Sequence, residues 1–444
     1  MAKGQASSVQ PVVPGRRRKE VVAPTPELAA REARGRQART ATPLEDHAGF
    51  DPTALRPDPV ELLGRQGSSR VEELLPIRYG RMVASPFAFY RGAALVMAAD
   101  LASTPNSGLR VQLCGDAHVA NFGFFASPER NLVFDMNDFD ETLPGPFEWD
   151  VKRLAASLEI VARSLSFHHK EIRTVVLECA RGYREAMRTF AAMPNLAVWY
   201  SRLDAEQFLA ELRGKTTPER LRKAQALLAK APTRDSTQAF GKLTHIVDGR
   251  VRIISDPPLI VPIEEVFPGA GAEAVFEQMA DLLRAYRSSL PSDRQVLFDQ
   301  YRFVHMARKV VGVGSVGTRA WVLLFEGVDS GDPLFLQAKE AQSSVLEQYL
   351  GVSEYSNHGE RVVAGQRLLQ ATSDIFLGWQ RTNGLDGVDR DYYLRQLRDG
   401  KASAAVEGTV PEGLAVYARL CGWTLARGHA RSGDRVAIAG YLGE

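Results

Sequence analysis

The stretch that decides the fold is VQLCGDAHVANFGFFASPERNLVFDMNDFDETLPGPFEWDVKRLAAS, residues 111–157. Its pattern predicts a short apolar strand over residues 110–113 that ends at Gly115. Three polar residues follow the strand within six positions: Asp116, His118 and Asn121. Polar side chains placed directly after a buried strand are candidates for binding or chemistry, because the strand fixes their position.

A predicted hairpin then supplies four acidic residues: Asp135, Asp138, Asp140 and Glu141. Carboxylate and amide oxygens are the ligands that hard divalent cations prefer. A carboxylate beside such a cation can also orient or deprotonate a hydroxyl. Asx turns and helix caps would explain any one of these residues, but their concentration within 26 residues favours a functional site.

The segment GDAHVAN resembles the catalytic loop of the aminoglycoside-phosphotransferase-like kinases, Gly-Asp-x-His-x-x-Asn. In that superfamily the Asp accepts the proton of the acceptor hydroxyl and the Asn helps to hold Mg²⁺. The resemblance implies catalytic roles for Asp116 and His118. It implies a metal site that contains Asn121, Asp138 and Asp140. The main metal-binding Asp of the hairpin is expected to be Asp138, and Asp135 and Asp140 are the alternatives for that position. It also implies that Asp150 braces the catalytic loop.

The nucleotide-binding signals of such a kinase come later in the chain. Four small residues lie between apolar strand segments and could approach phosphates closely: Gly312, Gly314, Ser315 and Gly317. A tight hairpin would explain these glycines equally well. Lys339 ends an apolar strand and resembles the kinase Lys that contacts phosphates, although an edge-strand Lys is the plain alternative. Glu360 opens the next helix and matches the Glu that pairs with that Lys, with Glu347 as the alternative.

Along the chain the catalytic loop and the metal-binding Asp come first, and the glycine-rich segment, the Lys and the Glu follow. A kinase chain cut just before its catalytic loop would have this order. The fold class that we predict is therefore α/β (α+β), a circularly permuted, two-lobed, protein-kinase-like fold with extra helices. The expected parts are a disordered basic tail, a helical lobe with the catalytic loop and metal-binding hairpin, a mainly β nucleotide-binding lobe, and a C-terminal helix that returns to the helical lobe. They span residues 1–45, 46–300, 301–398 and 399–444.

Beyond residue 45 the chain also resembles an uncharacterised bacterial family, domain of unknown function 2252. The segments that carry this resemblance include RYGRMVASPFAFYRGAA, CGDAHVANFG, KVVGVGSVGTRAWVLL and LARGHARSGD. The family itself looks kinase-like and implies no particular substrate. Arg78, Arg81 and Arg91 flank an apolar helix predicted from Phe87 to Leu101, and we interpret them as partners of the acidic cluster or of a phosphate.

Composition narrows the classes of function. The 444 residues carry a net charge of +2, which is the sum of +6 in residues 1–40 and −4 in the rest. This balance argues against a nucleic-acid partner, with only the basic tail as a candidate contact. Three scattered cysteines, no apolar leader and no long apolar run predict a cytoplasmic protein without a membrane partner.

The function that these observations predict is phosphotransfer from ATP, with Mg²⁺, to a hydroxyl on an unidentified small molecule or protein. A nucleotide-binding pseudokinase without phosphotransfer is the first alternative. A metal-dependent phosphohydrolase is the second, and it leaves the glycine-rich segment and Lys339 unexplained.

Overall fold

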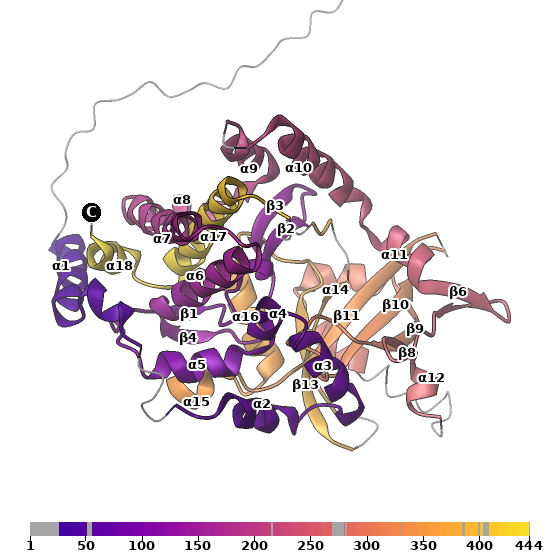
Figure 1. Ribbon diagram of the computed structural model, residues 1–444. Helices are drawn as coiled ribbons and strands as arrows, with labels where there is room; N and C mark the ends of the chain where they lie inside the picture. The colour runs from indigo at the N-terminus through magenta and orange to yellow at the C-terminus, as the bar shows by residue number, and fades with distance from the viewer. Residues whose placement is uncertain are drawn as a thin grey trace, which may run out of the picture.

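The computed structural model describes residues 26–444 except 51–55, 215, 269–278, 280–281, 330, 384–386, 398–399, 403–407 and 444. It is a mixed α/β protein with several antiparallel sheets (Figure 1). A helical part and a part built on a six-stranded sheet lie side by side. Among the described helices, none has the length and apolar character that crossing a bilayer requires.

The first described elements are helices, and those after residue 55 lie where the sequence predicts short helical segments. They are α1 (Pro26–Ala41), α2 (Pro59–Gly67), α3 (Leu75–Met82), α4 (Pro86–Gly92) and α5 (Ala94–Ala102). The helix expected from Phe87 to Leu101 is thus two helices that meet at Ala93, where the backbone leaves the helical region at ψ 37°.

The expected tail is not disordered over α1. This helix packs against α18 (Arg435–Leu442), and Arg31 and Arg34 pair with Asp434. The basic residues that suggested a solvated tail therefore contact the acidic cap of another helix. The basic run Arg-Arg-Arg-Lys at residues 16–19, part of the same predicted tail, lies outside the described residues.

The rest of the helical part contains the quoted segment. Its elements are β1 (Arg110–Leu113), β2 (Phe122–Ala126), β3 (Leu132–Met136), β4 (Leu143–Pro146), α6 (Phe147–Ser164), α7 (His169–Ala191), α8 (Asn195–Tyr200), β5 (Leu203–Asp204), α9 (Ala205–Leu212), α10 (Pro218–Lys230) and α17 (Pro411–Ser432). Strand β1 pairs with β4, and β2 and β3 form the expected hairpin.

Helices α7 and α17 cross closely at the centre of this part. A Cβ on Gly182 would lie 2.3 Å from the carbonyl oxygen of Arg419, and one on Gly422 would lie 2.2 Å from that of Cys179. Glycine at both positions therefore permits backbone contact that any side chain would prevent. Helix α17 thus packs on α7 within the helical part.

The sheet part has the strand order β12-β13-β11-β10-β9-β8, all antiparallel. Its elements are α11 (Ser236–Leu243), β6 (Thr244–Val247), β7 (Arg250–Ile253), β8 (Ile260–Pro262), α12 (Ile263–Val266), α14 (Ser292–Phe298), β9 (Arg302–Lys309), β10 (Ala320–Glu326), β11 (Pro333–Ala341), α15 (Glu347–Leu350), α16 (His358–Leu369), β12 (Gly378–Asn383) and β13 (Asp389–Gln396). Helix α16 packs against β11, β12 and β13.

The sheet part begins before the predicted boundary at residue 301. Tyr286 and Phe298 pack on one face of the sheet, and Ala239 and Leu243 pack on the other. Both faces of the sheet are apolar and need cover, and the preceding segment supplies it.

Candidate active site

The loop after β1 is braced from two helices. Gly115 has φ +83°, and a Cβ there would lie 2.3 Å from the carbonyl oxygen of Glu141. The Asp150 carboxylate on α6 accepts hydrogen bonds from the N–H groups of Cys114, at 2.8 Å, and Gly115, at 3.1 Å. His429 on α17 lies 3.2 Å from the same carboxylate. These contacts confirm the bracing role expected for Asp150.

From the sequence, the place of His429 near a helix end favours a cap or a surface ion pair, but the structure buries the side chain. Its second ring nitrogen contacts the Tyr183 hydroxyl at 2.8 Å, and both side chains are buried. Only the packing of α17 on α7 reveals this position.

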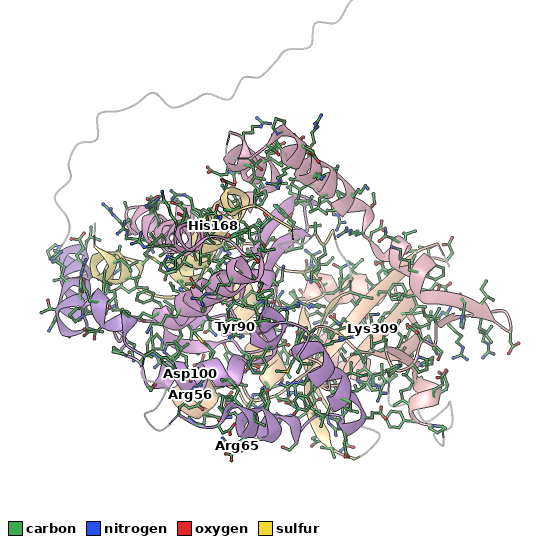
Figure 2. All side chains as sticks on the ribbon, viewed as in Figure 1. Arg56, Arg65, Tyr90, Asp100, His168 and Lys309 are labelled. Carbon is green, nitrogen blue, oxygen red and sulfur yellow. The ribbon has the colours of Figure 1, made fainter. Side chains whose placement is uncertain are left out.

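Asp116 presents one oxygen to the protein and one toward open space. Arg153 Nε donates to Oδ1 at 2.6 Å, and its guanidinium lies 4.5 Å from the ring of Tyr90, which is labelled in Figure 2. Oδ2 lies 3.9 Å from Nε2 of His118. Burial lowers the pKa of His118 to about 4, so the imidazole is neutral at pH 7. Asp116 is thus oriented by a cation while Oδ2 remains available.

Asn121 and Asp138 each place a side-chain oxygen at the site. Asn121 lies in the loop that follows β1, and Asp138 lies just after β3. The Asn121 side-chain amide donates to the carbonyl oxygen of Asp116 at 2.9 Å, which leaves the amide oxygen free to bind a cation. Burial raises the pKa of the Asp138 carboxyl, but Lys339 and Arg395 lower it more, so Asp138 is ionised at neutral pH.

These two donors fit Mg²⁺, which typically takes one or two carboxylates and completes its shell with phosphate and water. No group of three or more His, Cys, Asp or Glu side chains suited to a metal occurs within the described residues. A magnesium site here would therefore depend on oxygens from its ligand.

Lys339 lies on β11 and pairs with Asp140, not with Glu360. Its ammonium donates to Asp140 Oδ2 at 2.6 Å, and the Tyr393 hydroxyl donates to Oδ1 at 2.5 Å. Burial lowers the pKa of Lys339, but Asp140 and Tyr393 raise it more strongly, and the amine stays charged. Asp140 is therefore engaged with a cation already, which distinguishes it from Asp138 as a metal ligand.

The residue of helix α16 that contacts the acidic loop is Arg361, which follows Glu360. Glu360 is half-buried in the first turn, where its N–H is capped by Asn357, and the ion pair of Lys339 is made with Asp140. The buried Arg361 instead donates to the carbonyl oxygens of Asp140, Thr142 and Gln342 at 2.7–2.9 Å. The expected Lys–Glu pair is replaced by an arginine that ties the acidic loop to β11.

The glycine-rich loop joins β9 to β10 and is held from outside the sheet. Arg70 Nη1 donates to the carbonyl oxygens of Gly314 and Val316, at 2.7 and 2.5 Å. Arg81 donates to Gly312 at 2.6 Å. Arg70 precedes α3 in the chain and Arg81 lies in α3, which Figure 1 shows beside the sheet.

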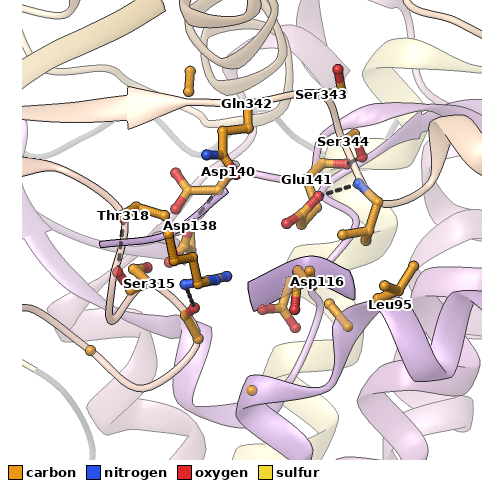
Figure 3. A pocket seen from close by; sticks show the side chains of 18 of the residues that line it. Leu95, Asp116, Asp138, Asp140, Glu141, Ser315, Thr318, Gln342, Ser343 and Ser344 are labelled. Carbon is orange, nitrogen blue, oxygen red and sulfur yellow. Dashed lines mark hydrogen bonds between the residues drawn. The ribbon is translucent and has the colours of Figure 1, made fainter. Parts of the chain in front are cut away.

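Two adjoining cavities bring the predicted residues together. The larger, of about 750 Å³, is lined by Asp116, His118, Asn121, Asp138, Asp140, Gly312, Gly314 and Ser315. The smaller, of about 400 Å³, contains Lys339 and shares Asn121, Asp138, Gly312 and Ser315 with the larger one. Gly317 and Glu360 line neither. Figure 3 shows Asp116, Asp138 and Glu141 around one space, with Ser315 and Thr318 at its side.

Glu141 is a cavity carboxylate whose ionisation the fold disfavours. Its Oε2 accepts a hydrogen bond from the N–H of Val345 at 2.7 Å, but burial raises its pKa from 4.5 to about 7. Between these pH values the folded chain holds a proton that the unfolded chain releases. The contribution of Glu141 to stability is therefore largest below pH 4.5 and falls as the pH rises to 7.

We expect Glu141→Gln to become more stable relative to the wild type, by roughly 1–3 kcal/mol, as the pH rises from 5 to 8. Urea denaturation of both proteins at each pH measures this difference. His118 acts in the opposite sense between pH 4 and 6.5 in both proteins, so the difference isolates Glu141. Thr318→Ala removes a hydroxyl of the same cavity that donates to the Ser315 carbonyl oxygen, and should differ from the wild type equally at every pH. A constant difference for Glu141→Gln would contradict the prediction.

The fold and the site define an α/β protein with a polar cleft between a helical part and an antiparallel sheet. The chain belongs to a family of uncharacterized proteins conserved in bacteria, domain of unknown function 2252, whose profile matches residues 70–444. Neither the curated proteins nor the solved structures contain a significant match to the chain.

Proposed function

We propose that this chain is a kinase-like phosphotransferase that moves a phosphoryl group from ATP to a hydroxyl acceptor. The observation that carries the proposal is the meeting of Lys339 with the acidic hairpin, 199 positions away in sequence, at a cavity that the glycine-rich loop also lines. A phosphotransferase needs a charge-neutralising cation, a backbone cradle and an oriented carboxylate at one place.

Each residue has a separate task in this proposal. Lys339 and the glycine-rich loop bind the phosphates of ATP, while Asn121 and Asp138 hold Mg²⁺, which neutralises charge on those phosphates when bound. Asp116 Oδ2 receives the acceptor hydroxyl, because Arg153 occupies Oδ1. His118 is neutral and buried, so it supports the loop and does not supply a proton.

The sheet order supports a circularly permuted kinase-like architecture. Strands β9, β10 and β11 are consecutive neighbours, which places the glycine-rich loop and Lys339 on the same part of the sheet. Helix α16 follows Lys339 in sequence and packs back on its strand. The catalytic loop precedes all of these elements, and this order is the one that a cut before the loop would produce.

A nucleotide-binding protein without phosphotransfer is the second candidate. It uses the same nucleotide site, since in either case the Lys339–Asp140 pair would have to open or be shared before Lys339 reached a phosphate, and it differs only in that Asp116 receives no acceptor hydroxyl. The phosphohydrolase alternative is weaker, because it needs Asp140 as a metal ligand, and that carboxylate is bound by both Lys339 and Tyr393.

We expect Mg·ATP to raise the melting temperature of the wild type by several degrees, since a ligand at about 100 times its Kd stabilises by ~2.7 kcal/mol. Lys339→Met should lose this shift. Lys152→Met is the matched control, because Lys152 is a half-buried lysine of α6 that donates to Thr104 and lines neither cavity. No shift in the wild type, or an unchanged shift in Lys339→Met, would contradict the nucleotide-binding half of the proposal.

A further inference from the structure

Arg91 stands at the boundary between the two cavities. It is the penultimate residue of α4, a helix whose start is fixed by Pro86 and by the Ser85 hydroxyl, which accepts from the Ala88 N–H at 3.0 Å. A Cβ on Gly314 would lie 3.0 Å from the Arg91 carbonyl oxygen, so the end of α4 abuts the glycine-rich loop. Arg91 lines both cavities, as do Asn121, Asp138, Gly312 and Ser315.

Arg91 differs from the arginines around it in having no partner. Arg70, Arg78, Arg81 and Arg153 each donate to a carbonyl, amide or carboxylate oxygen. Within the part of the chain that the structure describes, no side chain or carbonyl accepts a hydrogen bond from Arg91, and its Nε is buried without a partner. Arg91 is half-buried, and its guanidinium at the boundary of the cavities has donors that a ligand can satisfy.

The acceptors that this position calls for are those of a phosphoryl group. A guanidinium presents a planar fork of donors that matches two oxygens of a phosphate. One of the adjoining cavities holds Lys339 and the other holds Asp116. A group that passes from a nucleotide on one side to a hydroxyl on the other crosses the boundary that Arg91 lines.

We propose that Arg91 is a catalytic residue that binds the transferring phosphoryl group, supplied by a helix that precedes the catalytic loop. The inference rests on the proposed phosphotransferase function. In the step, the bond between the γ-phosphorus and the oxygen that bridges it to ADP breaks, and ADP keeps the electron pair. A bond from the acceptor oxygen to phosphorus forms, and the acceptor proton passes to Asp116. Arg91 donates to the equatorial oxygens, where charge is spread during transfer.

The test compares binding of Mg·ADP with and without fluoroaluminate, which mimics the planar transferring group. We expect fluoroaluminate to tighten Mg·ADP binding to the wild type. In Arg91→Ala the factor by which fluoroaluminate tightens binding should be at least tenfold smaller, while the affinity for Mg·ADP alone should change less than threefold. Arg91→Lys, which keeps the charge without the fork, should lose part of the gain. Arg110→Lys, at an arginine that donates to the carbonyl oxygen of Pro144 and lines neither cavity, should keep it.

The outcomes separate the two proposals. Failure of the wild type to bind Mg·ADP would overturn the phosphotransferase proposal and this inference with it. Normal Mg·ADP binding, with either no fluoroaluminate effect in the wild type or an undiminished effect in Arg91→Ala, would overturn the role of Arg91 alone. Restoration of ATP turnover in Arg91→Ala by added guanidinium ion would support it, because a structural role would not be recovered by a small cation.

Discussion

Asp116→Asn is expected to lower kcat for ATP turnover by about 10²–10⁴-fold while Mg·ATP still raises the melting temperature. The amide keeps the shape of the side chain but cannot accept the acceptor proton. Nucleotide binding should survive, because the proposed phosphate contacts come from Lys339 and the glycine-rich loop. With water as the acceptor, slow release of phosphate from ATP gives the readout even before the natural acceptor is identified.

Two further variants sharpen this result. Asp138→Asn should lose both turnover and the Mg²⁺-dependent part of the thermal shift, because Asp138 is the ionised carboxylate at the proposed metal position. Asp100→Asn is the neutral control: that carboxylate binds Arg56 outside both cavities, and Figure 2 labels the two residues. Turnover in Asp116→Asn within a few fold of the wild type would rule out its catalytic role.

The parts of the site that the sequence predicts well are local. Gly115, Asp116 and Asp150 lie within 36 residues, and a strand, a turn and a helix start fix their relations. The hairpin of β2 and β3 follows from the same short-range rules. An Asp-Gly pair such as Asp248-Gly249 is typical of a two-residue hairpin turn, and it joins β6 to β7 in the structure. Such features need no knowledge of how distant segments meet.

The partner of Lys339 could not be predicted in this way. A Lys that ends a strand can meet any carboxylate that the fold brings to it, and Asp140 is 199 positions away. On α16 the choice between Glu360 and Arg361 amounts to a rotation of about 100° around the helix, which depends on how the helix sits on the sheet. The buried side of α16 includes Arg361, Val362 and Val363, so the arginine and not the glutamate reaches the site.

The predicted start of strand β12 was wrong for a related reason. From the sequence, the apolar segment DIFLGWQ predicts a strand that starts at Asp374, but β12 begins only at Gly378. The Asp374 carboxylate accepts hydrogen bonds from the N–H groups of Phe376 and Gln396, at 2.8 and 2.5 Å, and so holds a turn before the strand. An apolar run with an Asp at its start reads as strand throughout unless that side-chain contact is known. Helix α18 was likewise absent from the prediction, since its start depends on a cap by Asp434.

The largest loss of stability is expected from Arg427→Met, which would break a fully buried ion pair. Arg427 on α17 donates to Asp135 Oδ1 at 2.6 Å, and each side chain is only 1% exposed. The remaining partners of the Asp135 carboxylate are the N–H groups of Met136, at 2.9 Å, and Ala371, at 2.8 Å. Removal of the cation leaves a buried charge, which costs about 3–5 kcal/mol. Urea denaturation measures the loss.

The matched control is Arg419→Met on the same helix, because the ion pairs of Arg419 with Glu178 and Glu185 are partly exposed and should contribute about 1 kcal/mol or less. The double variant Asp135→Asn/Arg427→Met should recover part of the stability lost in Arg427→Met, since no unpaired charge remains. Equal losses in Arg427→Met and Arg419→Met would contradict the prediction. The comparison also separates the two acidic positions of the hairpin: Asp135 joins β3 to α17 and stabilises the fold, which leaves Asp138 to face the cavity.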